Sequence, residues 1–224
     1  MLHAFNASTG VETFAYVPNA IYSKLKTLSS PSNSHQYYVD GPLSEGDAYF
    51  GTGSAAAWKT YVVGSTGAGA PSVFALDVTS PGSLGTASVK WEKSSADTGF
   101  ANLGLVLGQS TIVRLTTGQW GVVFGNGYDS ATGVASLFVV NLADGSVIKE
   151  FALGGTANGL SAPALVFNDN RELIGAYAGD LAGNLWRFNL SDTSAANWTS
   201  SALFTAKDAA SPAVVQPIVQ KPVV

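Results

Sequence analysis

The hydrophobic positions of this chain fall in short runs separated by glycine-rich or polar turns. The pattern is tightest in AYAGDLAGNLWRFNL, residues 176–190, where two apolar runs flank a turn that contains Gly179 and Gly183. Glycine adopts the positive φ that tight turns need, and runs this short are too brief for helices. This stretch therefore predicts a β-hairpin.

The second run of the hairpin ends in an asparagine, and three other apolar runs also end in Asn or Asp. LHAFN, VFALD, LFVVN and LWRFN close at Asn6, Asp77, Asn141 and Asn189. We interpret these endings as an internal repeat. Short strands with frequent turns would also suit a β-sandwich, but a recurring strand unit favours a repeat architecture.

Three units of four strands can be read along the chain, over residues 37–93, 106–152 and 161–206. Four-stranded units at this spacing are the signature of a β-propeller. The near-continuous apolar runs VFAL, LFVV and LWRF predict that each unit, or blade, buries both faces of its sheet against its neighbours. The first blade is expected to comprise YYVDG, TYVVG, SVFALDV and SVKWEK.

The rest of the chain is expected to add a half blade over residues 1–17, a helical insertion over 18–34 and a trailing strand over 213–224. In the insertion, Ile21, Leu25 and Leu28 are spaced to share one face of a short helix. We therefore predict an all-β fold, a single partial β-propeller domain over 1–224 that is a fragment of a longer chain. Such an arc would expose unpaired strand edges that favour self-association.

Composition narrows the function classes. The chain has 46% hydrophobic and 12% charged residues, with 25 Gly and no Cys, which suits many short strands. A net charge of −4 with only 11 Lys plus Arg argues against nucleic-acid binding. No apolar run has the length that a membrane span needs, and the N-terminus lacks the pattern of a signal peptide.

Four segments carry a family resemblance: MLHAFNASTGVETFAYVPNAIYSKL, SHQYYVDG, GQSTIVRLTTGQWGVVFGNGY and AYAGDLAGNLWRFNL. Together they resemble the C-terminal propeller domain of the PilY/PilC type IV pilus tip proteins, over essentially the whole chain. The resemblance implies an exported adhesin and assembly factor at the pilus tip, cell surface or periplasm. It implies roles in pilus biogenesis, surface adhesion and twitching motility, with minor pilins and host or surface ligands as partners.

The same resemblance implies a calcium loop within FNDNRELIG, residues 167–175, since calcium is the ion of this family. Its register, counted from AYAGD, places the turn glycine on Arg171 and the ligand positions on Val166, Asn168, Asn170, the carbonyl of Glu172, and Ile174. Calcium needs several hard oxygen ligands, and Val166 and Ile174 supply no side-chain oxygen. We expect a degenerate loop, with Asn168, Asn170 and Glu172 as the remaining candidate ligands.

Other chemistry is sparse in the sequence, and we predict no catalytic residue and no cofactor. His3 and His35 lack metal-ligand spacing, and His35 with Asp40 could orient a general base for which no nucleophile is apparent. GTGSAAA, residues 51–57, fits a dinucleotide fingerprint, but AAAWK leads directly into a strand, so a blade connection is expected. GSTGAGAP, residues 64–71, is expected to be a hairpin loop.

Two functions from different classes remain open at this point. The first is a non-enzymatic propeller of a pilus-tip factor. The second is part of a pyrroloquinoline-quinone-dependent dehydrogenase, whose propeller blades also close with an apolar run, Asp or Asn and a Thr-Gly turn. A quinone enzyme would gather Trp, Asp, Glu and Arg side chains around the cofactor. The five tryptophans lie on separate strands or connections, which favours the first function.

Overall fold

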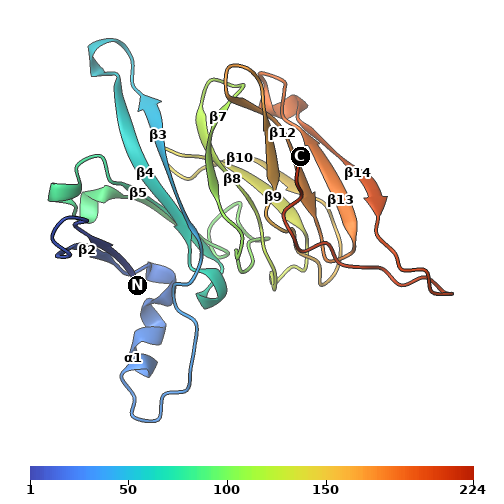
Figure 1. Cartoon of the computed structure of the whole chain (residues 1–224), viewed down its shortest axis with the longest axis horizontal. Coiled ribbons are helices and arrows are strands. Elements are labelled where there is room, and N and C mark those ends of the chain that lie inside the picture. The colour runs from blue at the N-terminus through green and yellow to red at the C-terminus, as the bar shows by residue number, and fades with distance from the viewer.

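The computed structural model describes all 224 residues, and its strands form an N-terminal hairpin followed by three side-by-side meanders in chain order (Figure 1). The strands are β1 (Leu2–Phe5), β2 (Glu12–Tyr16), β3 (Leu43–Phe50), β4 (Ala57–Ser65), β5 (Ser72–Asp77), β6 (Val89–Ser94), β7 (Thr111–Leu115), β8 (Trp120–Gly125), β9 (Ser136–Asn141), β10 (Val147–Ala152), β11 (Ala164–Phe167), β12 (Glu172–Gly179), β13 (Asn184–Asn189) and β14 (Thr199–Thr205). The architecture is all-β and propeller-like, as the repeat predicts.

Each blade is an antiparallel meander: β3 to β6 form the first blade, β7 to β10 the second and β11 to β14 the third. The hairpin of β1 and β2 is a separate sheet beside the first blade. The second and third blades are joined into one sheet by a short parallel pairing of β7 with β12, in which Arg114 lies opposite Glu172 and Leu115 opposite Leu173.

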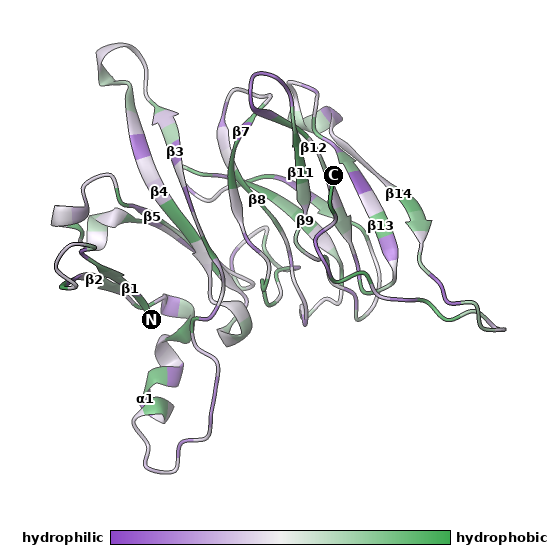
Figure 2. Ribbon diagram, in the orientation of Figure 1, coloured by the Kyte–Doolittle hydropathy of each residue, from purple (hydrophilic) through white to green (hydrophobic).

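The second blade shows why its apolar runs are continuous. Side chains alternate between the two faces of a strand, and on β9 Phe138 and Val140 pack against the first blade, whereas Leu137 and Val139 pack against the third. Figure 2 shows the same composition on β8, which is hydrophobic along most of its length. The prediction that the LFVV run is buried on both faces is confirmed.

The first blade is likewise covered on both faces. On β5, Val73 and Ala75 contribute to the core shared with the second blade. Phe74 and Leu76 point the other way and pack against the hairpin of β1 and β2 through Tyr16. The half blade therefore completes the burial of the VFAL run.

The third blade differs from the prediction. On β13, Phe188 is buried in the core shared with the second blade, but Arg187 is exposed and Leu185 only half-buried. The expectation that the LWRF run is buried on both faces is wrong for this chain. No strand of residues 1–224 lies over the face of the third blade that points away from the second blade. On β14, all residues are exposed.

The recurring Asn or Asp at the end of an apolar run has a local structural cause. In each case the side-chain Oδ1 accepts the backbone N–H two residues later: Ser8 to Asn6 (2.9 Å), Thr79 to Asp77 (3.1 Å), Ala143 to Asn141 (2.9 Å) and Ser191 to Asn189 (3.2 Å). These Asx turns begin the connection to the next strand. The repeat therefore marks the place where β1, β5, β9 and β13 end.

A tryptophan fixes the joint between the first two blades. Trp91 on β6 is buried and donates its ring Nε1–H to the carbonyl of Leu142, which follows β9 (2.8 Å). Gly145, in the β9–β10 turn at φ +71°, lies so close beneath the indole that a Cβ there would stand 2.8 Å from the Trp91 Cδ2. This position needs glycine both for its backbone conformation and for the contact.

The first strand of the first blade is not where the sequence places it. YYVDG, residues 37–41, forms no strand, and β3 is instead the polar segment LSEGDAYF. Asp40 accepts the backbone N–H of Ala68 (2.9 Å), so the YYVDG segment wraps around the β4–β5 turn. On β3 only Ser44 and Ala48 are buried, which is why hydrophobicity does not reveal the strand.

The helical insertion is largely a 3₁₀ helix, Asn19–Lys24, followed by the single α-helical turn α1 (Leu25–Leu28). Ile21 is fully buried, but Leu28 is 51% exposed, so the expected apolar face is only partly used. The start of the insertion is held by Glu92 on β6, whose carboxylate accepts the backbone N–H groups of Asn19 and Ala20 at 2.8 Å each. No helix of the protein has the length and apolar character to cross a bilayer.

The trailing strand expected over residues 213–224 is absent. The C-terminal segment is extended, and it touches the third blade through single hydrogen bonds from Gln216 to Ala206 and from Ile218 to Asp180, both 2.9 Å. Pro217 and Pro222 interrupt this segment, and proline has no N–H to donate to a ladder. The segment therefore lies against the blade without extending its sheet.

Candidate functional site

The expected calcium loop is the tight hairpin turn between β11 and β12, and its polar groups bond to one another. The Asn168 Oδ1 accepts the backbone N–H groups of Asn170 (3.0 Å) and Glu172 (2.9 Å), and its Nδ2–H donates to the Glu172 Oε2 (3.0 Å). The other Glu172 oxygen lies 3.7 Å from the Arg114 Nε. The side chains of Asn168 and Glu172 are therefore engaged in holding the turn.

The positions flanking this turn are built as strand rather than as ligand loop. Val166 is paired in the β11–β12 ladder opposite Gly175, and the carbonyl of Ile174 accepts the N–H of Leu190 (3.0 Å). Arg171 takes a positive φ of 60°, the conformation that a glycine would adopt more easily. No group of three or more His, Cys, Asp or Glu side chains in the chain is placed to hold a metal ion.

The histidines do not assemble a catalytic pair. His3 makes a 2.7 Å contact from its Nδ1 to Glu12 across the β1–β2 hairpin, where both side chains are partly exposed. His35 packs edge-on against the ring of Tyr37, and Asp40 accepts the N–H of Ala68 instead of orienting an imidazole. His35 and Asp40 are therefore separate structural contacts.

Both glycine-rich segments are hairpin connections, as expected. Residues 51–57 turn from β3 into β4 through a short 3₁₀ segment, Gly53–Ala55, and no helix follows that could present its N-terminus to a pyrophosphate. Residues 64–71 make the turn from β4 to β5, closed by the buried Thr66, whose hydroxyl donates to the carbonyl of Ala70 (2.6 Å).

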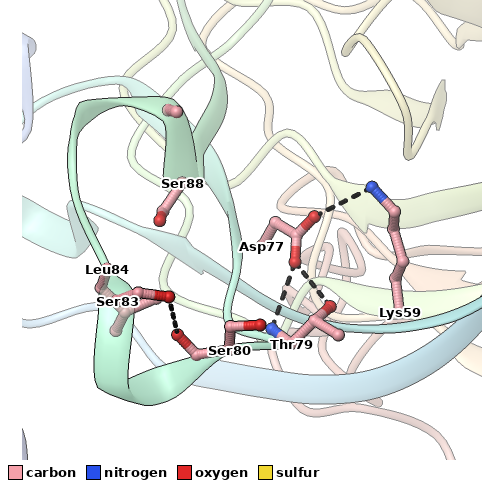
Figure 3. Close-up of a pocket in the computed structure, with 8 residues that line it drawn as sticks. Lys59, Asp77, Thr79, Ser80, Ser83, Leu84 and Ser88 are labelled. Carbon is pink, nitrogen blue, oxygen red and sulfur yellow. Dashed lines mark hydrogen bonds and ion pairs between the residues drawn. The ribbon is translucent and has the colours of Figure 1, made fainter.

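A polar hollow of about 320 Å³ lies at the end of β5 (Figure 3). Its carboxylate, Asp77, accepts the hydroxyl (2.6 Å) and N–H (3.1 Å) of Thr79 on one oxygen and the Lys59 Nζ (3.2 Å) on the other. Burial alone raises the pKa of Asp77, but the hydrogen bonds from Thr79 and the Lys59 ammonium outweigh it and hold the pKa below its usual value. Asp77 is thus held ionised in a turn.

A second carboxylate, Asp180, is completely buried inside the stretch 176–190. One oxygen accepts the N–H of Asn184 (2.8 Å), and the other accepts three side-chain N–H groups, from Trp186 (2.8 Å), Asn184 (3.0 Å) and Asn158 (3.2 Å). No cation is paired with it. Asp180 is therefore held inside the hairpin by four N–H donors and has no contact with solvent.

The tryptophans do not converge on a common axis. Trp91, Trp186 and Trp198 are fixed within or between blades by hydrogen bonds from their ring N–H groups. Trp58 and Trp120 do come together, with ring centroids 6.2 Å apart. Sequence reasoning missed this pair, because the two residues belong to different blades and only the order of the blades in space brings them close.

The sequence profile of the PilY1 β-propeller domain matches residues 1–218. The chain belongs to this family. The PilY1 family assignment agrees with the fold, since the crystal structure of the PilY1 C-terminal domain of Pseudomonas aeruginosa superposes with a TM-score of 0.80 at 33% identity. That superposition covers 99% of this chain and 47% of the solved chain.

Among the relatives named type IV pilus biogenesis factor PilY1 or its homologue, two are 43% identical to this chain. The one from Xylella fastidiosa is 43% identical over 211 residues, which are 88% of this chain and 14% of the relative. The one from Pseudomonas aeruginosa strain UCBPP-PA14 is 43% identical over 197 residues, which are 85% of this chain and 16% of the relative. The chain thus spans about one sixth or less of the length of these PilY1 relatives.

Proposed function

We propose that this chain is the propeller of an exported, type IV pilus-associated factor that acts in pilus biogenesis, surface adhesion and twitching motility. The observation that carries the proposal is the family match over residues 1–218, together with relatives named for pilus biogenesis at 43% identity. In this proposal the domain works at the pilus tip, cell surface or periplasm. Its partners are minor pilins and host or surface ligands.

The test is a deletion of residues 1–218 from the parent protein in its own host. We expect loss of surface pili and of twitching motility, with recovery when the intact gene is supplied. Immunoblots of the periplasmic and sheared-pilus fractions show whether the shortened protein is still exported. Normal piliation and motility in a strain that exports the shortened protein would contradict the proposal.

We further propose that the domain has no enzymatic activity of its own. This is supported by the engagement of its best-placed polar groups, Asp77 and Asp180, in hydrogen bonds that close turns. Purified parent protein mixed with pyrroloquinoline quinone and simple alcohols should therefore give no reduction of an electron-accepting dye. Turnover that depends on the quinone would favour the dehydrogenase alternative.

The β11–β12 turn is proposed to bind calcium only at millimolar concentrations or more weakly. Calcium affinity follows the number of charged ligands and the rigidity of the loop, and here Asn168 and Asn170 are neutral while the Glu172 carboxylate bonds to Asn168. Calorimetric titration of the folded parent protein should show no micromolar binding. Micromolar binding that is lost in the double variant Asn168→Ala, Asn170→Ala would contradict this.

A constructive experiment complements this titration. The combined variant Val166→Asp, Asn170→Asp, Arg171→Gly and Ile174→Asp supplies three carboxylates and a turn glycine in the register counted from AYAGD. We expect it to bind calcium more tightly than the unaltered loop. If the folded variant binds no better, the proposed register is wrong.

A further inference from the structure

The hairpin tips of the first and second blades enclose an open cleft lined largely by aromatic side chains. The β3–β4 and β7–β8 tips both lie at the top of Figure 1, and the hollow between them has a volume of about 470 Å³. It is lined by Tyr49, Gly51, Trp58, Arg114, Gly118 and Trp120. We refer to these residues as the aromatic cleft.

The rings of the aromatic cleft form a continuous row across the two blades. Tyr49 and Trp58 are a cross-strand pair with centroids 5.3 Å apart, and Trp58 meets Trp120 edge-on at 6.2 Å. Trp120 packs in part on the core, whereas Trp58 is 60% exposed and Tyr49 47% exposed. Two large rings are therefore held at the surface with about half or more of their area in water.

The ring N–H groups divide the tryptophans of the protein into two kinds. Trp91, Trp186 and Trp198 each donate to a protein acceptor at 2.8 Å. Trp58 and Trp120 donate to none. The aromatic cleft thus combines flat apolar surface with hydrogen-bond donors that the fold does not use.

The aromatic cleft also carries a positive charge, that of Arg114. Arg114 lies opposite Trp120 in the β7–β8 ladder, and its side chain is 50% exposed. Glu172 is 3.7 Å from the Arg114 Nε and outside the lining, so it leaves the guanidinium able to meet a second carboxylate. Apart from the hydroxyl of Tyr49, the polar side-chain atoms that line the cleft are all donors.

We propose that the aromatic cleft binds an acidic pyranose, a uronic acid residue of a polysaccharide. The C–H face of such a ring would lie on the indole of Trp58, its ring oxygens and hydroxyls would accept the free ring N–H groups, and its carboxylate would pair with Arg114. The cleft is of the size that small ligands occupy. This site deepens the adhesion part of the proposed function, and its biological meaning rests on that proposal.

Other ligand classes fit the lining less well. A peptide backbone brings N–H donors that need acceptors, and the only side-chain acceptor in the cleft is the Tyr49 hydroxyl. Single-stranded nucleic acid would stack on the rings, but its phosphates require a positive groove, and the cleft has one cation in a chain of net charge −4. A neutral sugar would leave Arg114 without its partner.

The test is calorimetric titration of the purified parent protein with an α-1,4-linked hexagalacturonate, followed in parallel by tryptophan fluorescence. We expect saturable binding below about 1 mM, with maltohexaose at least about tenfold weaker and hexaglutamate without saturable binding. Trp58→Ala and Arg114→Gln should each weaken binding of the hexagalacturonate by about tenfold or more.

Matched controls are available on the same chain. Tyr22→Ala removes a ring that is 69% exposed and distant in sequence from the cleft, and Arg187→Gln removes an exposed cation of the third blade. Both should change the affinity less than about twofold. Thermal melting is used to check that each variant is folded, which is expected because Trp58 and the Arg114 side chain are at least half exposed.

The proposal is overturned if the unaltered protein shows no saturable binding of hexagalacturonate. Equal affinity for maltohexaose would show that the carboxylate of the sugar is not recognised. Equal affinity for hexaglutamate would show that the cleft recognises carboxylates on a peptide as well as it does those on a sugar. Either result contradicts the assignment. Sugar binding and piliation are measured in separate experiments. If the sugar does not bind but the deletion strain still loses its pili and twitching motility, the cleft proposal fails and the proposed function stands.

Discussion

The second and third blades are built from the same strand pattern but are buried to very different extents. On β9 every residue before the terminal Asn141 is buried, whereas on β13 only Phe188 is. Both runs are apolar and both end in the same Asx turn. The difference lies in their neighbours, since β9 has a blade on each side and β13 has one. Burial in this protein is therefore a property of the joints between blades.

The contrast can be tested most strongly with one phenylalanine from each blade. Phe138 on β9 is fully buried between the rings of Phe100 and Phe124, at 5.5 and 5.4 Å, whereas Phe204 on β14 is 53% exposed. Phe138→Ala should lower the free energy of unfolding by about 3 to 5 kcal/mol, through lost burial and a cavity. Phe204→Ala should change it by less than about 0.5 kcal/mol, as at most surface positions.

Urea unfolding of the two variants measures both values. Similar losses for Phe138→Ala and Phe204→Ala would show that the third blade is as tightly covered as the second, and the comparison would fail.

The next effect concerns Asp180, a fully buried carboxylate that holds the β12–β13 turn of the less buried third blade. Asp180→Asn replaces a carboxylate oxygen that accepts hydrogen bonds with an NH₂ group. This NH₂ group would then lie against the N–H groups of Trp186 and Asn158, which need an acceptor. We expect a loss of about 2 to 3 kcal/mol, the range for hydrogen bonds to buried charged groups. Asp192→Asn is the control, because Asp192 is exposed in a turn after β13. Equal stabilities of the two variants in urea would contradict the role of Asp180 as an anchor.

A smaller effect, a loss of folding stability in acid, is expected from Asp77 in the first blade. The pKa of Asp77 is lowered from 3.8, so the folded state binds its proton less readily than the unfolded chain does. Its contribution to stability is present above about pH 3.8 and is lost as the pH falls through the lower folded value. Asp77→Asn should remove this part of the acid destabilisation, an effect of less than about 1 kcal/mol for a partly exposed ion pair.

Unfolding by urea between pH 2.5 and 6 gives the measurement. Thr79→Val, which removes the strongest hydrogen bond to Asp77, should flatten the same part of the curve. An unchanged acid slope in both variants would show that the Asp77 turn does not contribute.

The smallest change in stability is expected on the outer face of the third blade, where the consequence is for association. Figure 2 shows hydrophobic colour on the end of β14, where Leu203 is 49% and Phe204 53% exposed. Exposed edge strands pair with other chains, and we propose that residues 1–224, expressed alone, self-associate there. Phe204→Lys should leave unfolding within about 0.5 kcal/mol of the original and shift sedimentation toward monomer. An unaltered protein that sediments as a stable monomer would contradict the proposal.

Much of the fold could be predicted from the chain because its signals are local. The endings at Asn6, Asp77, Asn141 and Asn189 mark Asx turns, which depend on residues two positions apart. Strand β3 could not be predicted, because a blade edge with only Ser44 and Ala48 buried carries no apolar run. The C-terminal segment was misleading for the opposite reason, since its valines suggest a strand that its prolines prevent.

The candidate sites were less predictable than the fold. The Asn168 turn depends on neighbouring residues alone, because the Asn168 side chain accepts N–H groups two and four positions further along the chain. The aromatic cleft joins Tyr49 and Trp58 of one blade to Arg114 and Trp120 of another. Spacing along the chain carries no information on which hairpin tips meet, so such a site requires the arrangement of the blades.

The connectors between blades also affect the order in which the molecule can be completed during synthesis. Ser65, at the end of β4, donates its hydroxyl to the carbonyl of Val106, and Leu160 receives the N–H of Gly127 just beyond β8. Val106 and Leu160 lie in the connectors to the second and third blades, so each acceptor leaves the ribosome after the blade it closes. The first two blades can therefore be completed only after the connector that follows each of them has been synthesised.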